Sequence, residues 1–142
     1  MRAMILKTPG VLEPGDVDKP VTEDGNVLVR VANSGICGTD LEIYSGGIPV
    51  DYPRIMGHEM IGEITETADP GVAVGSRVIV DPVMACGTCY QCRAGQNNLC
   101  LVGGLIGRDR DGGFADFVSV PAGNVYADRK STRLNSSHTS IS

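Results

Sequence analysis

Four of the five cysteines lie within fifteen residues, in the stretch CGTCYQCRAGQNNLC, and this cluster strongly limits what the chain can fold into. The spacing is Cys-x2-Cys-x2-Cys-x7-Cys, at Cys86, Cys89, Cys92 and Cys100. Thiolates three residues apart can point at one ion, because tetrahedral zinc with Zn–S bonds of about 2.3 Å needs sulfurs only about 3.7 Å apart. The ion would organise a lobe, about residues 82–103, that has too few apolar side chains to fold by itself. The pattern therefore predicts a structural zinc site.

Clustered cysteines also occur in disulfide frameworks and in iron–sulfur proteins. Disulfides need an oxidising compartment, and the start of the chain, MRAMILKTPG, is too short and too polar for a secretory signal. We therefore expect a cytoplasmic protein with reduced cysteines. An iron–sulfur cluster stays an alternative, because the first three cysteines match the opening of a bacterial ferredoxin motif. In that motif the fourth follows about three residues later and precedes proline, whereas Cys100 follows seven residues later and precedes Leu101.

Composition favours a single domain of short strands. The chain has 142 residues with 19 glycines and 8 prolines, which favours many turns, and no tryptophan, so its core rests on aliphatic side chains. The net charge of −5 argues against a nucleic-acid partner. No apolar run approaches the roughly 20 residues of a membrane-spanning helix, so no membrane partner is expected.

Hydrophobic patterning predicts an all-β dominated fold with short helices. Strands are expected at residues 2–6, 26–37, 61–65, 74–82 and 114–121, and residues 13–26 are expected to be loop. Residues 38–46 favour one or two helical turns, capped by Thr39 or Asp40. Short strands separated by glycine and proline turns suggest a small closed or partly closed barrel. No Gly-x-Gly-x-x-Gly follows a strand, so a Rossmann dinucleotide-binding unit is absent from the sequence.

The last fifteen residues, DRKSTRLNSSHTSIS, differ from the rest in having no periodicity and many serines and threonines. A flexible polar tail is the simplest interpretation. The run also resembles the translation of a common sequencing-adapter oligonucleotide. On that hypothesis residues 1–127 form the domain, residues 128–142 are a non-native disordered tail, and the natural chain continues differently beyond Ala127.

A second group of residues could bind a metal ion: Cys37 in GICGTD, and His58 and Glu59 in GHE. A thiolate, an imidazole and a carboxylate are ligand types that a catalytic zinc uses while one position stays open. Each residue alone is a weak indication, because a lone cysteine is usually a small buried apolar residue and a lone histidine is more often structural.

Five motifs in order resemble the N-terminal catalytic domain of the zinc-dependent medium-chain alcohol, sorbitol and threonine dehydrogenases. They are GICGTDLEIY, YPRIMGHEMIGEI, VGSRVIVDP, the cysteine spacing and DGGFADFVSVP, and they cover nearly all of residues 1–127. The resemblance implies a GroES-like barrel with a catalytic zinc, a structural-zinc lobe beside it, and a following Rossmann domain for NAD or NADP.

The resemblance also assigns roles residue by residue. Cys37 and His58 match catalytic zinc ligands, and Glu59 matches an acid that binds zinc directly or through water. Thr39 matches the hydroxyl that touches the substrate oxygen, and Asp40 matches the acid that orients the liganding histidine. The four clustered cysteines match the lobe ligands.

Two positions depart from the family pattern: Ser76 replaces the commoner acid before Arg77, which is expected to affect only a turn, and the other departure bears on the proton relay. Many members have a histidine three residues after the threonine, late in a proton relay, where this chain has Glu42. A relay that ends at Glu42 or at solvent is expected instead.

The implied activity is hydride transfer between NAD or NADP and an alcohol or polyol, or the matching aldehyde or ketone, with zinc as a Lewis acid. The full-length enzyme is expected to be a homo-oligomer with one catalytic and one structural zinc, and this fragment is expected to be inactive. A non-enzymatic, zinc-stabilised barrel is the alternative. The group Cys37, His58 and Glu59 discriminates between the two, because a purely structural barrel has no use for an open ligand set.

Overall fold

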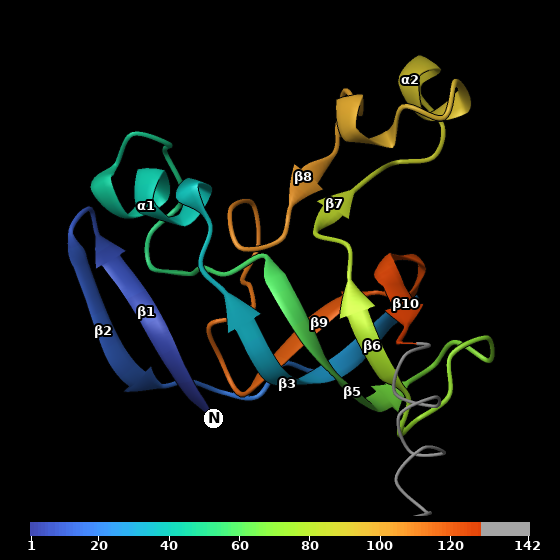
Figure 1. Ribbon diagram of the computed structural model, residues 1–142, viewed down its shortest axis with the longest axis horizontal. Coiled ribbons are helices and arrows are strands. Elements are labelled where there is room, and N and C mark those ends of the chain that lie inside the picture. The colour runs from blue at the N-terminus through green and yellow to red at the C-terminus, as the bar shows by residue number, and fades with distance from the viewer. Residues whose placement is uncertain (129–142) are drawn as a thin grey trace, which may run out of the picture.

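The structure, a computed structural model, describes residues 1–128 and is built mainly of short strands (Figure 1). Its elements, in chain order, are β1 (Arg2–Thr8), β2 (Val11–Asp16), β3 (Asn26–Gly35), α1 (Gly38–Ser45), β4 (Arg54–Ile55), β5 (Glu59–Thr67), β6 (Arg77–Val80), β7 (Val83–Met84), α2 (Tyr90–Arg93), the 3₁₀ turn η1 (Asn97–Leu99), β8 (Gly104–Leu105), β9 (Phe117–Pro121), the 3₁₀ turn η2 (Ala122–Asn124) and β10 (Val125–Ala127).

A five-stranded antiparallel sheet in the order β10-β6-β5-β3-β9 forms most of the barrel. Alternate side chains of these strands point inward, because successive residues of a strand face opposite sides of the sheet. They make most of the main core, to which Ile106, after β8, and Ala122, in η2, are added. The whole core consists of Val27, Val29, Met60, Ile64, Val78, Val80, Ile106, Val118, Val120 and Ala122. Burial of this aliphatic surface is the main driving force for closing the sheet around it.

A smaller sheet in the order β2-β1-β4 lies beside the barrel and carries α1 at one end (Figure 1). Ile43 of α1 is fully buried against Leu6 of β1 and Met56, which fixes the helix on this sheet. The helix starts shortly after β3, and the last residue of β3 pairs with the first residue of β5. The first turn of α1 therefore lies next to the end of β3 and the start of β5.

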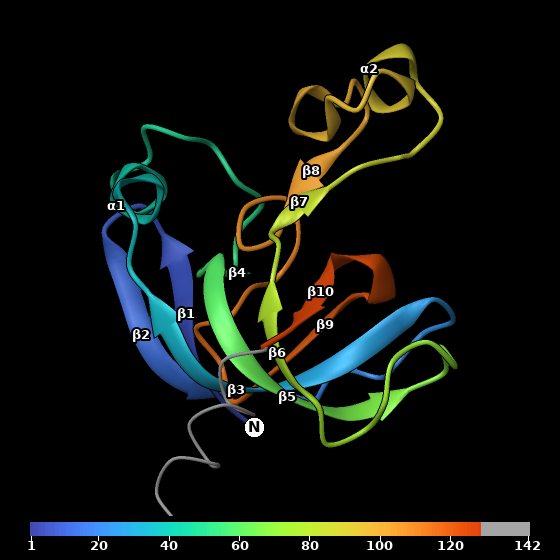
Figure 2. The same ribbon diagram turned by 45° about the vertical axis from the view of Figure 1, so that its right-hand side comes forward.

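The segment between β7 and β8 forms a lobe that projects from the barrel (Figure 2). β7 and β8 pair at its base through Val83–Leu105 and Met84–Gly104. Neither α2 nor η1 contributes a buried residue. The lobe therefore lacks an apolar core of its own, as its sequence predicts.

The predicted fold class is confirmed: the described residues are dominated by strands, and the longest helix among them is α1, with eight residues. The strands expected at residues 2–6, 26–37, 61–65 and 74–82 correspond to β1, β3, β5 and β6. β9 starts at Phe117, three residues later than expected.

The loop expected at residues 13–26 is partly wrong, because β2 runs through Pro14 and Gly15. β2 pairs only with β1 and is an edge strand of its sheet, where a proline without an N–H group is tolerated.

The expected helix cap is also wrong. The N-cap of α1 is Cys37, and Asp40 lies at the third helical position, where its carboxylate accepts a hydrogen bond from the Cys37 N–H group. This is the reciprocal half of a capping box, which stabilises the start of a helix.

The predicted tail, residues 128–142, lies outside the described residues except for Asp128. The Asp128 N–H group donates to the Arg77 carbonyl at 2.9 Å, and its carboxylate lies 3.7 Å from the Arg77 guanidinium. The domain boundary at Ala127 and the adapter origin stay predictions. No helix in residues 1–128 is long and apolar enough to span a bilayer.

Candidate metal centres

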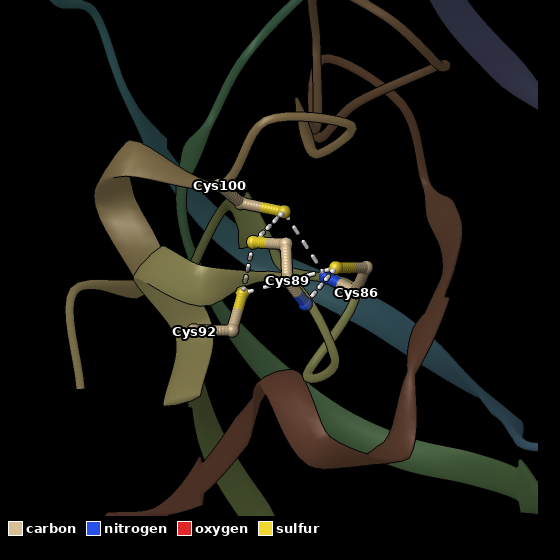
Figure 3. A group of neighbouring side chains, drawn as sticks. All are labelled: Cys86, Cys89, Cys92 and Cys100. Carbon is tan, nitrogen blue, oxygen red and sulfur yellow. Dashed lines mark hydrogen bonds between the residues drawn. The ribbon is translucent and has the colours of Figure 1, made fainter. Parts of the chain in front are cut away.

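The sulfur atoms of the four clustered cysteines point toward one another in the lobe (Figure 3). Cys86 follows β7, Cys89 is the N-cap of α2, Cys92 lies in α2, and Cys100 is the C-cap of η1. The Sγ–Sγ distance is 3.5 Å for Cys89–Cys92, 3.9 Å for Cys86–Cys92 and 4.0 Å for Cys89–Cys100. All four sulfurs lie within 4.8 Å of one another.

These distances fit a single tetrahedral ion. Zinc–thiolate bonds of about 2.3 Å place the sulfurs about 3.7 Å apart, which lies inside the observed range. A disulfide needs sulfurs only about 2.05 Å apart, and all four cysteines are free. A [4Fe–4S] cluster takes each thiolate on a different iron, which separates the sulfurs more widely than one shared ion does. The geometry therefore favours zinc over both alternatives.

Polar groups around the cluster favour thiolates at two of its positions. Hydrogen bonds from Thr88 and from the Cys89 N–H group lower the pKa of Cys86 to about 5. Hydrogen bonds from the backbone of Cys92 and Leu101 lower the pKa of Cys89. Burial, together with the neighbouring Cys89 thiol, raises the pKa of Cys92 to about 12. A divalent cation bound by all four thiolates would have to displace the Cys92 proton.

Sequence reasoning overlooked Thr88. Its hydroxyl lies 3.6 Å from the Cys86 sulfur. The available signal was its position between the first two cysteines, where a small hydroxyl side chain can donate to a thiolate without leaving the turn.

The second group lies where β3, α1 and β5 meet. Cys37 lies between β3 and α1, His58 lies just before β5, and Glu59 is the first residue of β5. The pairing of β3 with β5 ends at Gly35 opposite Glu59, which brings the three side chains together across 21 residues of sequence. One ligand atom from each lies within 4.8 Å of the others. His58 is buried, Cys37 is half-buried and Glu59 is exposed, so the group opens to solvent on the Glu59 side.

The buried side chain of Asp40 contacts both Cys37 and His58 of this group. Its side chain is 2% exposed, and its Oδ2 accepts a hydrogen bond of 2.9 Å from the Cys37 N–H group. Its Oδ1 accepts a hydrogen bond of 3.3 Å from the Gly57 N–H group and lies 3.4 Å from His58 Nδ1. One buried carboxylate therefore contacts the residues on both sides of the proposed metal site.

His58 supports the fit of a metal ion. Its Nδ1 is buried beside Asp40 but makes no hydrogen bond of good geometry. With Nδ1 turned toward the carboxylate, Nε2 is the nitrogen that a metal ion would use, and liganding histidines commonly have such a carboxylate on their other nitrogen. The donor set of one thiolate, one imidazole and one carboxylate suits zinc.

The backbone conformation that brings His58 close to Asp40 requires glycine at residue 57. Its φ of +93° lies in the left-handed region, where side chains are disfavoured. An added Cβ would lie 2.5 Å from the Phe114 ring. A larger residue would therefore clash with Phe114 and strain the backbone next to His58.

Thr39 and Glu42, both on α1, are placed differently. Thr39 is half-buried, and its Oγ1 accepts from the Cys37 thiol at 3.9 Å, so it lies beside the proposed site. Glu42 is exposed, and its Oε2 lies against Gly47, where an added Cβ would be 2.5 Å away. No hydrogen bond among residues 1–128 joins the Glu42 carboxylate to Thr39. The relay role of Glu42 stays a prediction without a direct contact.

The chain matches a family of known domains. Residues 23–129 match the alcohol dehydrogenase GroES-like domain. Among curated proteins, the chain is 42% identical over 135 residues to the L-threonine 3-dehydrogenase of Pyrococcus horikoshii, covering 89% of this chain and 39% of that protein.

Solved structures show the same fold. One is the short chain alcohol dehydrogenase rspB of Escherichia coli CFT073, complexed with NADH, with a TM-score of 0.83 and 39% sequence identity. The match covers 89% of this chain and 38% of that chain. The cobalt- and zinc-bound thermostable alcohol dehydrogenase of Pyrobaculum aerophilum has a TM-score of 0.88 and 34% identity, over 91% and 41% of the two chains. This chain thus spans about two fifths of the length of the proteins that it matches.

Proposed function

The chain belongs to the alcohol dehydrogenase GroES-like domain family, and we propose that it is the metal-binding catalytic domain of a zinc-dependent oxidoreductase. The reaction is hydride transfer between an alcohol or polyol, or the matching carbonyl compound, and NAD or NADP. The observation that carries the proposal is the convergence of Cys37, His58 and Glu59 within 4.8 Å, open to solvent on one side.

Cys37, His58 and Glu59 would hold the catalytic zinc, and the four lobe cysteines would hold a structural zinc. The catalytic ion, when bound, would polarise the substrate oxygen and lower the pKa of a hydroxyl group. Asp40 would keep the His58 ring oriented through Nδ1 and would tie Cys37 to the start of α1.

Thr39 would transfer the proton of the substrate hydroxyl group. Its Oγ1 lies 3.9 Å from the Cys37 sulfur, at the edge of the proposed site, where it can accept the proton of a bound alcohol while its own hydroxyl proton passes onward. From there the proton would leave to solvent, or to Glu42 after that side chain turns away from Gly47.

The nicotinamide cofactor would bind outside this domain. Residues 1–128 contain no strand followed by a glycine-rich turn and a long helix, the unit that binds dinucleotides. The longer relatives have about three fifths of their length beyond the matched region, which is room for such a unit. This chain by itself is expected to bind zinc and to catalyse little.

Zinc content tests the proposal. The purified 142-residue chain, saturated with zinc and freed of excess metal, is expected to contain two zinc ions. Cys37→Ala is expected to contain one, because the lobe ion remains. Metal analysis by mass spectrometry measures both. A single zinc in the wild-type chain, unchanged in Cys37→Ala, would contradict the proposal.

A further inference from the structure

The space beside the Glu59 carboxylate depends on one residue of the neighbouring strand. Gly35 is the last residue of β3 and pairs with Glu59, the first residue of β5. A Cβ built at Gly35 would lie 2.6 Å from Glu59 Oε2 and 3.2 Å from Glu59 Cβ. The carboxylate therefore rests on the position that a side chain at residue 35 would fill.

Glycine is required at residue 35 only because a side chain there would collide with Glu59, not because of its backbone conformation. The φ angle of Gly35 lies outside the left-handed region, unlike that of Gly57, so alanine could adopt the same backbone conformation. The atom that an added methyl group would displace most is a carboxylate oxygen at the end of an exposed, flexible side chain. We therefore expect the substitution to move the carboxylate at little cost to folding.

Such a movement matters because of where the carboxylate now lies. With glycine at residue 35, a Glu59 oxygen lies within 4.8 Å of ligand atoms of Cys37 and His58. Rotation of Glu59 away from a residue-35 methyl group would leave those two as the only ligands of this group among residues 1–128. Metal sites depend on the groups that position their ligands, since mutation of such a group typically costs about 10–100-fold in metal affinity or activity.

We propose that Gly35 is a positioning residue, which keeps the Glu59 carboxylate beside Cys37 and His58 and so makes it the third metal ligand of this domain. The proposal rests on the metal site proposed above. It assigns to the first glycine of GICG a role through Glu59 rather than through its own backbone.

Cobalt binding tests the proposal without any enzyme activity. The 142-residue chain is first given one equivalent of zinc, which the four lobe thiolates retain, since zinc binds such a site more tightly than cobalt. Co²⁺ is then titrated and followed by its visible absorption bands, which differ between a site with one thiolate and a site with four. The variants are Gly35→Ala, Glu59→Ala, the two combined, and Gly123→Ala as a glycine control. Gly123 is exposed, and an added Cβ there meets nothing within 4 Å.

We expect Gly35→Ala and Glu59→Ala each to raise the Kd for Co²⁺ by about 10–100-fold. The combined variant is expected to bind as Glu59→Ala does, because the methyl group acts only through the carboxylate. Gly123→Ala should bind as the wild type.

Other outcomes separate this proposal from the proposed function. A wild-type chain that takes no Co²⁺ beyond the lobe site would overturn both. If the wild type binds but Gly35→Ala binds equally well, the positioning role alone is wrong. If Glu59→Ala binds equally well, Glu59 is not a ligand, and the positioning role fails together with that part of the proposed metal site. The positioning role is also wrong if Gly35→Ala weakens binding equally with and without Glu59, which is the result that a disturbed strand would give.

Discussion

At the scale of single residues, Asp40 organises the proposed catalytic site. A carboxylate that is 2% exposed must have hydrogen-bond partners, and Asp40 accepts from the N–H groups of Cys37 and Gly57. His58 Nδ1 lies 3.4 Å from the same carboxylate. The same contact that caps α1 therefore orients a proposed metal ligand. Stability and metal affinity should depend on this residue together.

Asp40→Asn tests this coupling. The asparagine has the same shape, but its amide NH₂ replaces an acceptor with a donor against at least one of these groups. We expect a loss of about 1–3 kcal/mol in the free energy of unfolding, the usual cost of an unsatisfied buried group. The Co²⁺ Kd at the Cys37 site should rise about 10–100-fold. Urea denaturation and the cobalt titration measure the two effects.

Asp24→Asn is the matched control, because Asp24 is exposed and makes no side-chain hydrogen bond in the described structure. It should leave both quantities unchanged. Equal behaviour of the two variants would show that Asp40 does not couple the helix start to the metal site.

At the scale of elements, the lobe between β7 and β8 differs from the barrel in what stabilises it. The barrel strands bury eight apolar residues in one core, whereas α2 and η1 bury none. In such a segment the metal-binding free energy becomes the folding free energy of the segment. The barrel and the lobe should therefore respond differently to loss of metal.

Proteolysis with trypsin tests this difference. Arg93, in α2, is exposed, and so is Arg77, in β6. In Cys89→Ala, or after treatment of the wild type with a chelator, cleavage after Arg93 should accelerate at least about tenfold, because the lobe opens locally. Cleavage after Arg77 should not change. Mass spectrometry of the fragments over time measures both rates.

Cys37→Ala serves as the comparison, since it removes a ligand of the other proposed site. Its Arg93 site should stay as protected as in the wild type. Equal protection of Arg93 in Cys89→Ala and the wild type would mean that the lobe is stable without its ion.

At the scale of the whole molecule, an ion pair joins the first strand to a segment near the other end of the domain. Arg2 of β1 and Asp116, just before β9, are 114 residues apart in sequence. Asp116 accepts from the Arg2 N–H group at 2.9 Å and from its guanidinium at 3.1 Å. Hydrogen bonding to the Arg2 side chain lowers the pKa of Asp116.

This pair gives a pH-dependent contribution to stability. A carboxyl group whose pKa is lower in the folded state stabilises the fold above its unfolded pKa, about 3.9, and loses that contribution as the pH falls through the folded value. Asp116→Asn should therefore be less stable than the wild type at about pH 5, and the difference should shrink toward about pH 3. Urea midpoints of both proteins across this range measure it. A difference that stays constant would exclude ionisation of Asp116 as its cause.

Much of the fold and of the lobe site could be predicted because the signals are local. Alternation of apolar residues marked β3, β5 and β6, and four cysteines within fifteen residues can meet in one lobe with little help from the rest of the chain. The predictions that failed depended on neighbours in space. Pro14 lies in a strand because that strand is an edge of its sheet, and Asp40 is not the cap of α1 because its carboxylate accepts from the N–H group of the true N-cap, Cys37.

The sequence by itself determined the chemical identity of both proposed metal sites, since it contains the thiols, the imidazole and the carboxylate in recognisable motifs. Only the tertiary structure decided that Cys37, His58 and Glu59 meet, because they lie on separate elements and the pairing of Gly35 with Glu59 joins them. It also decided that the Glu42 carboxylate lies against Gly47. The reason is physical: side-chain position across strands depends on register and burial, which no short stretch of sequence encodes alone.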